Sequence, residues 1–243
     1  GSGASDVSLG ILRNIPIPNW NVKYSGLMRY KLFKDKFKRF SIQHSYKASY
    51  TLNSFRSNLD YDKDPLATDV SGNFRSSTII GNANLVEQFS PLVKIDFELK
   101  NSLKFLAELK KDRALSMSFD NNLLTEVKGI EYVVGVGYRI KDVIFTSAYA
   151  SDPSGVIKGD INIKADFSYR NNKTIVRYLD YENNQLAGGQ NIWSVKVTAD
   201  YALSKNLTAI FFYDHSFSKA VISTSFPLTN IRSGFTLRYN FGN

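Results

Sequence analysis

Two histidines are the side chains of this sequence best suited to general acid–base chemistry, because imidazole titrates close to neutral pH. They are His44 and His215, and each lies in a run whose alternate residues are apolar. Each shares the apolar side of its run, so the polar neighbours Ser45 and Asp214 point to the opposite side of an extended chain. That geometry is wrong for a proton relay. We predict no catalytic site, and we interpret both histidines as lying at the level of lipid headgroups or against another subunit.

Other reactive constellations are weak. The sequence has no cysteine, which excludes disulfides, Cys-based zinc sites and thiol catalysis. A basic stretch, Lys34, Lys36, Lys38 and Arg39, is interpreted as a solubilising cluster that flanks a bilayer, or as a dock for a periplasmic partner. The glycine-containing segment QLAGGQ (residues 185–190) joins two expected strands with no helix after it, so it does not resemble a phosphate-binding loop. We predict no metal and no cofactor.

Composition narrows the class of protein further. Apolar residues make up 43% of 243 residues and aromatic residues 14%, which suits a protein with aromatic belts at a membrane surface. The net charge is +9, but the basic residues alternate with apolar ones instead of forming a nucleic-acid-binding helix or module. No run of about 18 apolar residues is present, so no transmembrane helix is expected.

The elements that must position these residues are extended strands, because a period of two dominates the chain. From Phe40 to Leu52, for example, every second residue is apolar or aromatic except His44, and the residues between are polar. Such strands have one apolar side and one polar side. Residues expected to face lipid or a partner are Phe40, Ile42, Tyr46, Val93, Ile95, Phe97, Val134, Val136, Ile161, Ile163, Phe167, Trp193, Val195, Val197, Phe235, Leu237, Tyr239 and Phe241. Residues expected to face an aqueous lumen are Lys47, Lys94, Asp96, Glu98, Lys164, Asp166, Arg170, Lys196, Asp200 and Arg238.

Strand and loop lengths favour a membrane barrel. Most alternating runs reach the roughly 9–11 residues that a tilted strand needs to cross a bilayer, and residues 103–119 read as one long strand with a charged patch or bulge. Short periplasmic turns are expected at 101–102, 141–142, 171–172 and 204–206. Long extracellular links are expected between them, at 120–129, 150–159, 181–191 and 218–231, and the largest loop is expected at 57–88.

These boundaries give an all-β, antiparallel transmembrane β-barrel section of about eleven strands. Closed bacterial barrels of a single chain have an even number of strands, and hydrocarbon does not tolerate open sheet edges. We therefore expect a section of a larger barrel over residues 20–243, with the C-terminus in the periplasm. Residues 1–19 are interpreted as a linker or tag remnant and a lead-in. Alternatives are a porin-like or uptake barrel for small solutes and a soluble all-β binding domain.

A set of ordered phrases then resembles a known family, the C-terminal part of the SprA/Sov outer-membrane translocons of the type 9 secretion system. The matching segments are PIPNW (16–20), YSGL (24–27), EQFSPL (87–92), LTEV (124–127), VGVGYRIKDV (134–143), ADFSYRNNKT (165–174), QLAGGQ (185–190), ADYALSKNLTAIFFYD (199–214), STSFP (223–227) and NFGN (240–243). Ile17 departs from the Leu that family members often carry.

The resemblance implies a non-enzymatic function. Members of the family form a giant protein-conducting channel in the bacterial outer membrane that exports folded cargo proteins bearing a C-terminal secretion domain. It implies a PorV-like barrel and a periplasmic plug protein as partners, together with the remainder of the same barrel and outer-membrane lipid. In some bacteria the exported cargo supports gliding motility.

Overall fold

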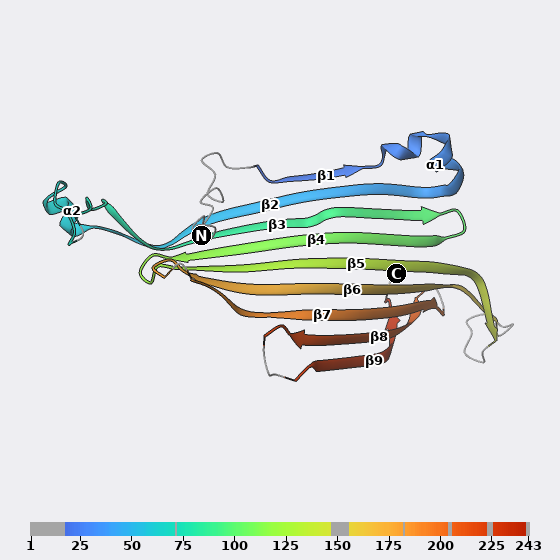
Figure 1. Cartoon of the computed structure of the whole chain (residues 1–243). Coiled ribbons are helices and arrows are strands. Elements are labelled where there is room, and N and C mark those ends of the chain that lie inside the picture. Colours follow the sequence, from blue (N-terminus) through green and yellow to red (C-terminus); the bar gives the residue numbers. More distant parts are fainter. Residues whose placement is uncertain are drawn as a thin grey trace.

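The chain forms a single antiparallel sheet of nine strands in the part that the computed structural model describes, which is residues 18–70, 72–146, 156–181, 183–203, 206–222 and 226–241. Each strand pairs with the next one in sequence, so the spatial order is β1 to β9 without a crossover (Figure 1). The strands are β1 (Trp20–Tyr24), β2 (Phe37–Ser57), β3 (Thr78–Leu99), β4 (Leu103–Ser118), β5 (Leu123–Thr146), β6 (Val156–Tyr178), β7 (Asn183–Ala202), β8 (Leu207–Ala220) and β9 (Leu228–Tyr239).

Helical structure is confined to the connections. The short helices η2 (Gly26–Arg29) and α1 (Lys31–Lys36) join β1 to β2, and α2 (Leu59–Lys63) lies in the loop between β2 and β3 (Figure 1). Asn58 caps α2 by accepting a 3.2 Å hydrogen bond from the backbone N–H of Asp60. Among the described residues, no helix has the length and apolar character needed to cross a membrane.

The register gives the sheet two chemically different faces. Directly opposite residues on neighbouring strands point to the same side, and one such row crosses eight strands through Ile42, Ile95, Ala107, Val134, Phe167, Val195, His215 and Ile231. The adjacent row points to the other side and contains Gln43, Lys94, Glu108, Val133, Ser168, Ser194, Ser216 and Asn230. We call the side that carries Val134 and Phe167 the apolar face, and the side that carries Lys164 and Asp166 the polar face.

The apolar face has no second layer over it within the described chain. Val134 is 40% exposed and Phe167 45%, although their strands, β5 and β6, are paired on both sides. Phe235, in the end strand β9, is 64% exposed. The few buried apolar residues are Tyr46, Ala83, Leu115, Leu124 and Ala209, and no large side chain of the described residues is fully buried. A sheet without a core cannot be held together by apolar packing inside this chain alone.

The strand count differs from the expected eleven, and the reason is local. Turns were predicted at Lys141–Asp142 and at Asn171–Asn172, but β5 continues through the first pair and β6 through the second. Asp142 has a positive φ of 56°, and the register with β6 shifts between Ile140 and Val143, so the polar pair marks a β-bulge. Asn171 and Asn172 are paired with Ile130 and Gly129 of β5. Each misread pair divided one long strand into two.

Two long extracellular links were also predicted wrongly. Residues 120–129 and 181–191 are mostly strand, because β5 begins at Leu123 and β7 at Asn183. The β2–β3 connection is long as predicted but shorter than 57–88, since β2 ends at Ser57 and β3 begins at Thr78, so residues 78–88 are strand. The simple alternation of short turns and long loops therefore does not hold. Residues 1–17, most of the 150–159 link, two residues of the 204–206 turn, residues 223–225 of the 218–231 link, and Gly242 and Asn243 lie outside the described residues.

Two other predictions about strands are confirmed. The turn at Asn101–Ser102 joins β3 to β4, with the backbone N–H of Ser102 donating to the carbonyl of Leu99 at 3.1 Å. Residues 103–118 form one strand whose ladder with β5 is continuous from Leu103 to Ser118. The bulge at this level lies in the neighbouring β3, where the register with β4 shifts between Phe89 and Val93.

The β3–β4 turn provides a test of the fold. Ser102 has a φ of 70°, in the left-handed region, where a β-branched side chain is strongly disfavoured. We expect Ser102→Gly to raise the free energy of unfolding by about 1 kcal/mol, because glycine avoids the cost of this conformation, and Ser102→Val to lower it, because a branched Cβ adds to that cost. Urea unfolding of the folded protein in detergent measures both values. Equal midpoints for the two variants would contradict the turn geometry.

Candidate functional site

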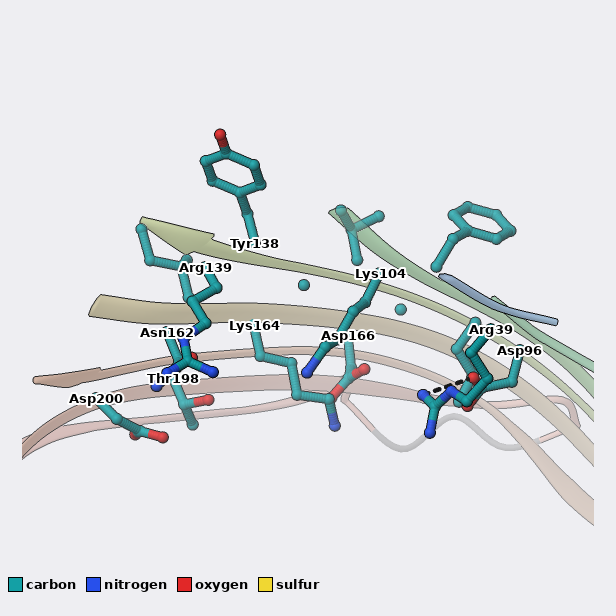
Figure 2. A pocket seen from close by; sticks show the side chains of 16 residues that line it. Arg39, Asp96, Lys104, Tyr138, Arg139, Asn162, Lys164, Asp166, Thr198 and Asp200 are labelled. Carbon is teal, nitrogen blue, oxygen red and sulfur yellow. Dashed lines mark hydrogen bonds and ion pairs between the residues drawn. The ribbon is translucent and has the colours of Figure 1, made fainter. Parts of the chain in front are cut away.

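A shallow hollow lies on the polar face, over the middle of the sheet. Its volume is about 270 Å³, and β2 to β7 contribute to its lining. The lining side chains that carry charge are Arg39, Asp96, Lys104, Arg139, Lys164, Asp166 and Asp200. Figure 2 shows Lys164, Asp166 and Asn162 on one side of the ribbons, and the ring of Tyr138 on the other side. The hollow is therefore a feature of the polar face alone.

Glycines in β5 create this hollow. Gly135 and Gly137 stand on the polar face, opposite Asp166 and Lys164 of β6. A Cβ atom at Gly135 would lie 2.5 Å from Oδ1 of Asp166, which is too close for carbon and oxygen. Because glycine has no side chain, the carboxylate of Asp166 can lie over β5. It forms a 2.8 Å ion pair with Lys164. Glycine in a strand interior often marks a close approach of this kind.

A second cluster surrounds Arg170, further along the same face. Its guanidinium contacts Asp112 of β4 at 2.8 Å and Glu131 of β5 at 3.3 Å, and its Nε donates to Asn172 at 2.8 Å. Lys110 adds a 3.8 Å contact to Glu131. Gly129 makes room here as well, because a Cβ at that position would lie 2.8 Å from Nη2 of Arg170. One arginine thus connects three strands across the face.

Charges on the polar face are mostly paired with each other. Arg39 binds Asp96 at 2.9 Å, a contact drawn as a dashed line in Figure 2. Further ion pairs on this side or at its margin join Lys38 to Glu98, Arg139 to Asp160, Lys164 to Asp166, and Arg232 to Asp214. The cation of each pair is at least half exposed, so each pair contributes only about 0–1 kcal/mol to stability. Their more important effect is to neutralise the face locally.

The apolar face carries a band of apolar residues with aromatic margins. On β7, Trp193 and Tyr201 bracket Val195, Val197 and Ala199, a stretch of roughly the 9–11 residues that a tilted strand needs to cross hydrocarbon. Tyr132, Tyr169, Trp193 and Phe217 form a row across β5 to β8 at one margin, which we call the aromatic row. Neighbouring ring centroids in this row are 6.5, 5.3 and 5.4 Å apart.

The two histidines lie far apart in the sheet order, on β2 and β8. Nδ1 of His44 is 2.6 Å from the carbonyl oxygen of Leu92, and the ring lies near Trp20 and Phe89. His215 lies edge-on to Tyr213, with ring centroids 6.3 Å apart. The polar neighbour of His215, Asp214, points to the other face and binds Arg232. Ser45, the polar neighbour of His44, donates a 3.4 Å hydrogen bond to the carbonyl oxygen of Trp20.

Two other predicted motifs are placed differently. The basic stretch divides, since Lys34 and Lys36 lie in α1 while Lys38 and Arg39 are bound to acids of β3. The segment 185–190 was expected to be a loop between strands, but it lies inside β7. Gly189, with a φ of 149°, sits against the backbone of Asn172, where a side chain would collide with the carbonyl oxygen. Small residues here serve close strand contact.

The register divides the sequence-predicted site residues between the two faces of the sheet, and what each face contacts stays a prediction. The predicted lipid- or partner-facing residues within the strands share the apolar face, and the predicted lumen-facing residues share the polar face. Phe241 follows β9 and packs against Tyr239, with ring centroids 4.8 Å apart. Sequence reasoning missed the Arg170 cluster, because its members are distant in sequence. The available signal was the polar-face parity of Asp112, Glu131 and Arg170, which the register makes neighbours.

The Arg170 cluster gives a stability prediction. Arg170→Met leaves Asp112 and Glu131 without their shared cation, and hydrogen bonds to charged groups contribute about 1.5–3 kcal/mol. We expect a loss of about that size in the free energy of unfolding. Arg139→Met is the matched control, because its pair with Asp160 is half exposed and should contribute under about 1 kcal/mol. Urea unfolding in detergent compares them, and equal losses would show that the cluster has no special role.

The polar face thus offers paired charges, amides and hydroxyls over several strands. Among the residues with described positions, no three His, Asp or Glu side chains gather closely enough to hold a metal ion. Such a surface can hydrate and can contact polar solutes or proteins through many weak bonds. A scan against protein-family models and a search of curated proteins both found no match to this chain.

Proposed function

We propose that this chain forms part of the wall of a large protein-conducting β-barrel in a bacterial outer membrane. In this proposal the apolar face meets lipid or a partner barrel, and the polar face lines a water-filled passage. The observation that carries it is the exposed apolar face of a single sheet, with Val134, Phe167 and Val195 all at least 36% exposed. Exposed apolar surfaces of this extent mark contact with a membrane or another protein.

Strand direction supports a section of a barrel over a small closed barrel. In an up-and-down sheet of nine strands, β1 and β9 run in the same direction. Direct closure would need a parallel pair, whereas bacterial single-chain barrels are antiparallel with an even number of strands. In the described residues, β1 pairs only with β2, and β9 only with β8. Hydrocarbon leaves no unpaired edge, so further strands must complete the wall.

Local charge pairing favours a protein passage over an ion-selective pore. Selective pores concentrate rings of unpaired charge of one sign. Here acid and base alternate across the polar face, as in the pairs of Arg39 with Asp96 and Arg170 with Asp112. A locally neutral, hydrated wall holds passing proteins only weakly, whatever their charge. The second candidate, a porin-like or uptake barrel for small solutes, would draw support from a domain or loop that fills the lumen.

The resemblance to SprA/Sov translocons specifies the proposal further. It adds folded cargo with a C-terminal secretion domain, a PorV-like barrel at the apolar face or a sheet edge, and a periplasmic plug. The chain would perform no chemistry and would need no cofactor. In this orientation the β2–β3 loop is extracellular and the end of β9 is periplasmic.

Membrane orientation can be tested with single cysteines, because these 243 residues contain none. Nitroxide labels at Val134, Val195 and Val197 should be accessible to oxygen, which concentrates in hydrocarbon. Labels at Val133, Ser194 and Lys196, on the other face of the same strands, should be accessible to a water-soluble nickel chelate. Electron paramagnetic resonance of the intact protein in vesicles measures both. Loss of this alternation would remove the membrane proposal.

The nature of the transported material needs a separate test. We expect a photo-crosslinking residue at Thr198, which lines the hollow, to capture exported proteins in cells that are actively secreting. The same residue at Val197, on the apolar face of β7, is the control and should capture none of them. Mass spectrometry of the crosslinked products identifies the cargo. Capture of no protein at either position, with impaired uptake of small solutes, would favour the porin-like alternative.

A further inference from the structure

A group of cations stands on the apolar face, immediately beyond the aromatic row. It consists of Lys111 and Arg113 of β4, Lys128 of β5, and Lys173 and Arg177 of β6, and we call it the basic shelf. The register places all five on the same side as Val134 and Phe167. Along β5 the order is Val134, Tyr132, Ile130, Lys128, so the apolar band passes through an aromatic ring to positive charge.

Three of these cations form a row of like charge. Arg113 is directly opposite Lys128, and Lys128 is directly opposite Lys173. Residues paired in this way have Cβ atoms about 4.5–5.5 Å apart, and like charges at that spacing destabilise a sheet. The polar face shows the contrary arrangement, in which acids and bases face each other. A row of cations on the apolar face therefore needs a compensating anion.

Carboxylates of the chain supply only part of that compensation. Glu126 is 3% exposed and binds Arg113 at 2.7 Å and Arg177 at 2.9 Å, with Lys128 at 3.9 Å. Glu87, opposite Arg113 in the register, accepts a hydrogen bond from the hydroxyl of Tyr46. Within the described part of the chain, Lys111 and Lys173 have no ion pair. Five cations thus face two carboxylates, and the shelf keeps an excess of positive charge.

We propose that the basic shelf binds the phosphate groups of a phosphorylated glycolipid in the outer leaflet. A phosphate monoester carries about −1.5 to −2 charges near neutral pH, so one group can neutralise two members of the row. Arginine and lysine are both suited to phosphate, and arginine can bind it in a bidentate manner. Arg113 and Lys173 lie two strand spacings apart, about 10 Å, which leaves room for one sugar phosphate between them.

The neighbouring band explains why a lipid fits better than an acidic protein. The headgroup phosphate would sit on Lys111, Lys128 and Lys173, while the acyl chains would continue over Tyr132 and Val134. An acidic peptide would satisfy the cations but would leave these exposed apolar side chains uncovered. The inference rests on the proposed membrane function, and it assigns a specific lipid contact to one margin of the apolar face.

The test compares two triple variants of the intact protein with equal loss of charge. The shelf variant is Lys111→Gln, Lys128→Gln, Lys173→Gln, and the control on the polar face is Lys47→Gln, Lys94→Gln, Lys196→Gln. Native mass spectrometry in phosphatidylcholine bilayers measures binding of bis-phosphorylated lipid A. We expect the shelf variant to bind it at least about tenfold more weakly, since one charge-assisted bond corresponds to roughly that factor. The control should bind like the natural protein.

Further arms identify the ligand. Dephosphorylated lipid A and phosphatidylglycerol should bind the natural protein much more weakly than the bis-phosphorylated form, and millimolar inorganic phosphate should not displace it. Equal binding of lipid A by the natural protein and the shelf variant would overturn the proposal. So would tighter binding of phosphatidylglycerol than of lipid A, or displacement of lipid A by free phosphate. Occupation of the basic shelf by an acidic protein in place of lipid A would also overturn it.

A nitroxide at Val134 in the same bilayers separates this failure from failure of the membrane function. If the label is accessible to oxygen in both triple variants and lipid binding is unchanged, only the lipid contact is wrong. If the label is inaccessible to oxygen in the natural protein, the membrane function fails first. Retention of the folded, heat-modifiable band on electrophoresis confirms that each triple variant has folded.

Discussion

The apolar face of the sheet is the constraint on which the other features depend. Burying a Val, Leu, Ile or Phe side chain contributes about 1.5–3 kcal/mol, and Val134, Phe167 and Val195 gain only part of that within the chain because they are at least 36% exposed. Summed over eight strands, the free energy that burial of the exposed apolar side chains would add is large compared with the marginal stability of a folded protein. An external apolar layer over this face would therefore stabilise the sheet further.

Backbone hydrogen bonding is continuous along the same sheet. The ladders from β2 to β9 run for most of each strand, and the bulges are few and local. Continuous pairing removes donors and acceptors that hydrocarbon could not satisfy. The glycines of β5 belong to this arrangement, because Gly129 and Gly135 let charged side chains of β6 lie flat on the polar face without parting the strands. Close strand contact and a hydrated face are thus achieved together.

The sequence specified the faces more accurately than the boundaries. Val93 and Lys94 lie on opposite faces, as alternation requires, because a side-chain period of two follows directly from the extended backbone. Alternation failed at Asn171–Asn172 and Lys141–Asp142, where polar pairs usually indicate turns. There the cross-strand partners, Gly129 and Ile130 for the asparagines, decide the structure, and partners cannot be read from a local window. The Arg170 cluster was hidden for the same reason.

The two faces manage charge in different ways, and the difference has a physical origin. On the polar face, Arg170 and Lys164 lie beside carboxylates, so attraction between neighbours replaces interaction with a ligand. At the margin of the apolar face, Arg113, Lys128 and Lys173 repel one another and are only partly relieved by Glu126. Water screens an exposed row of this kind, but a hydrocarbon boundary screens it poorly. The electrostatic repulsion within this row of cations is smallest when the surface that the row contacts carries negative charge.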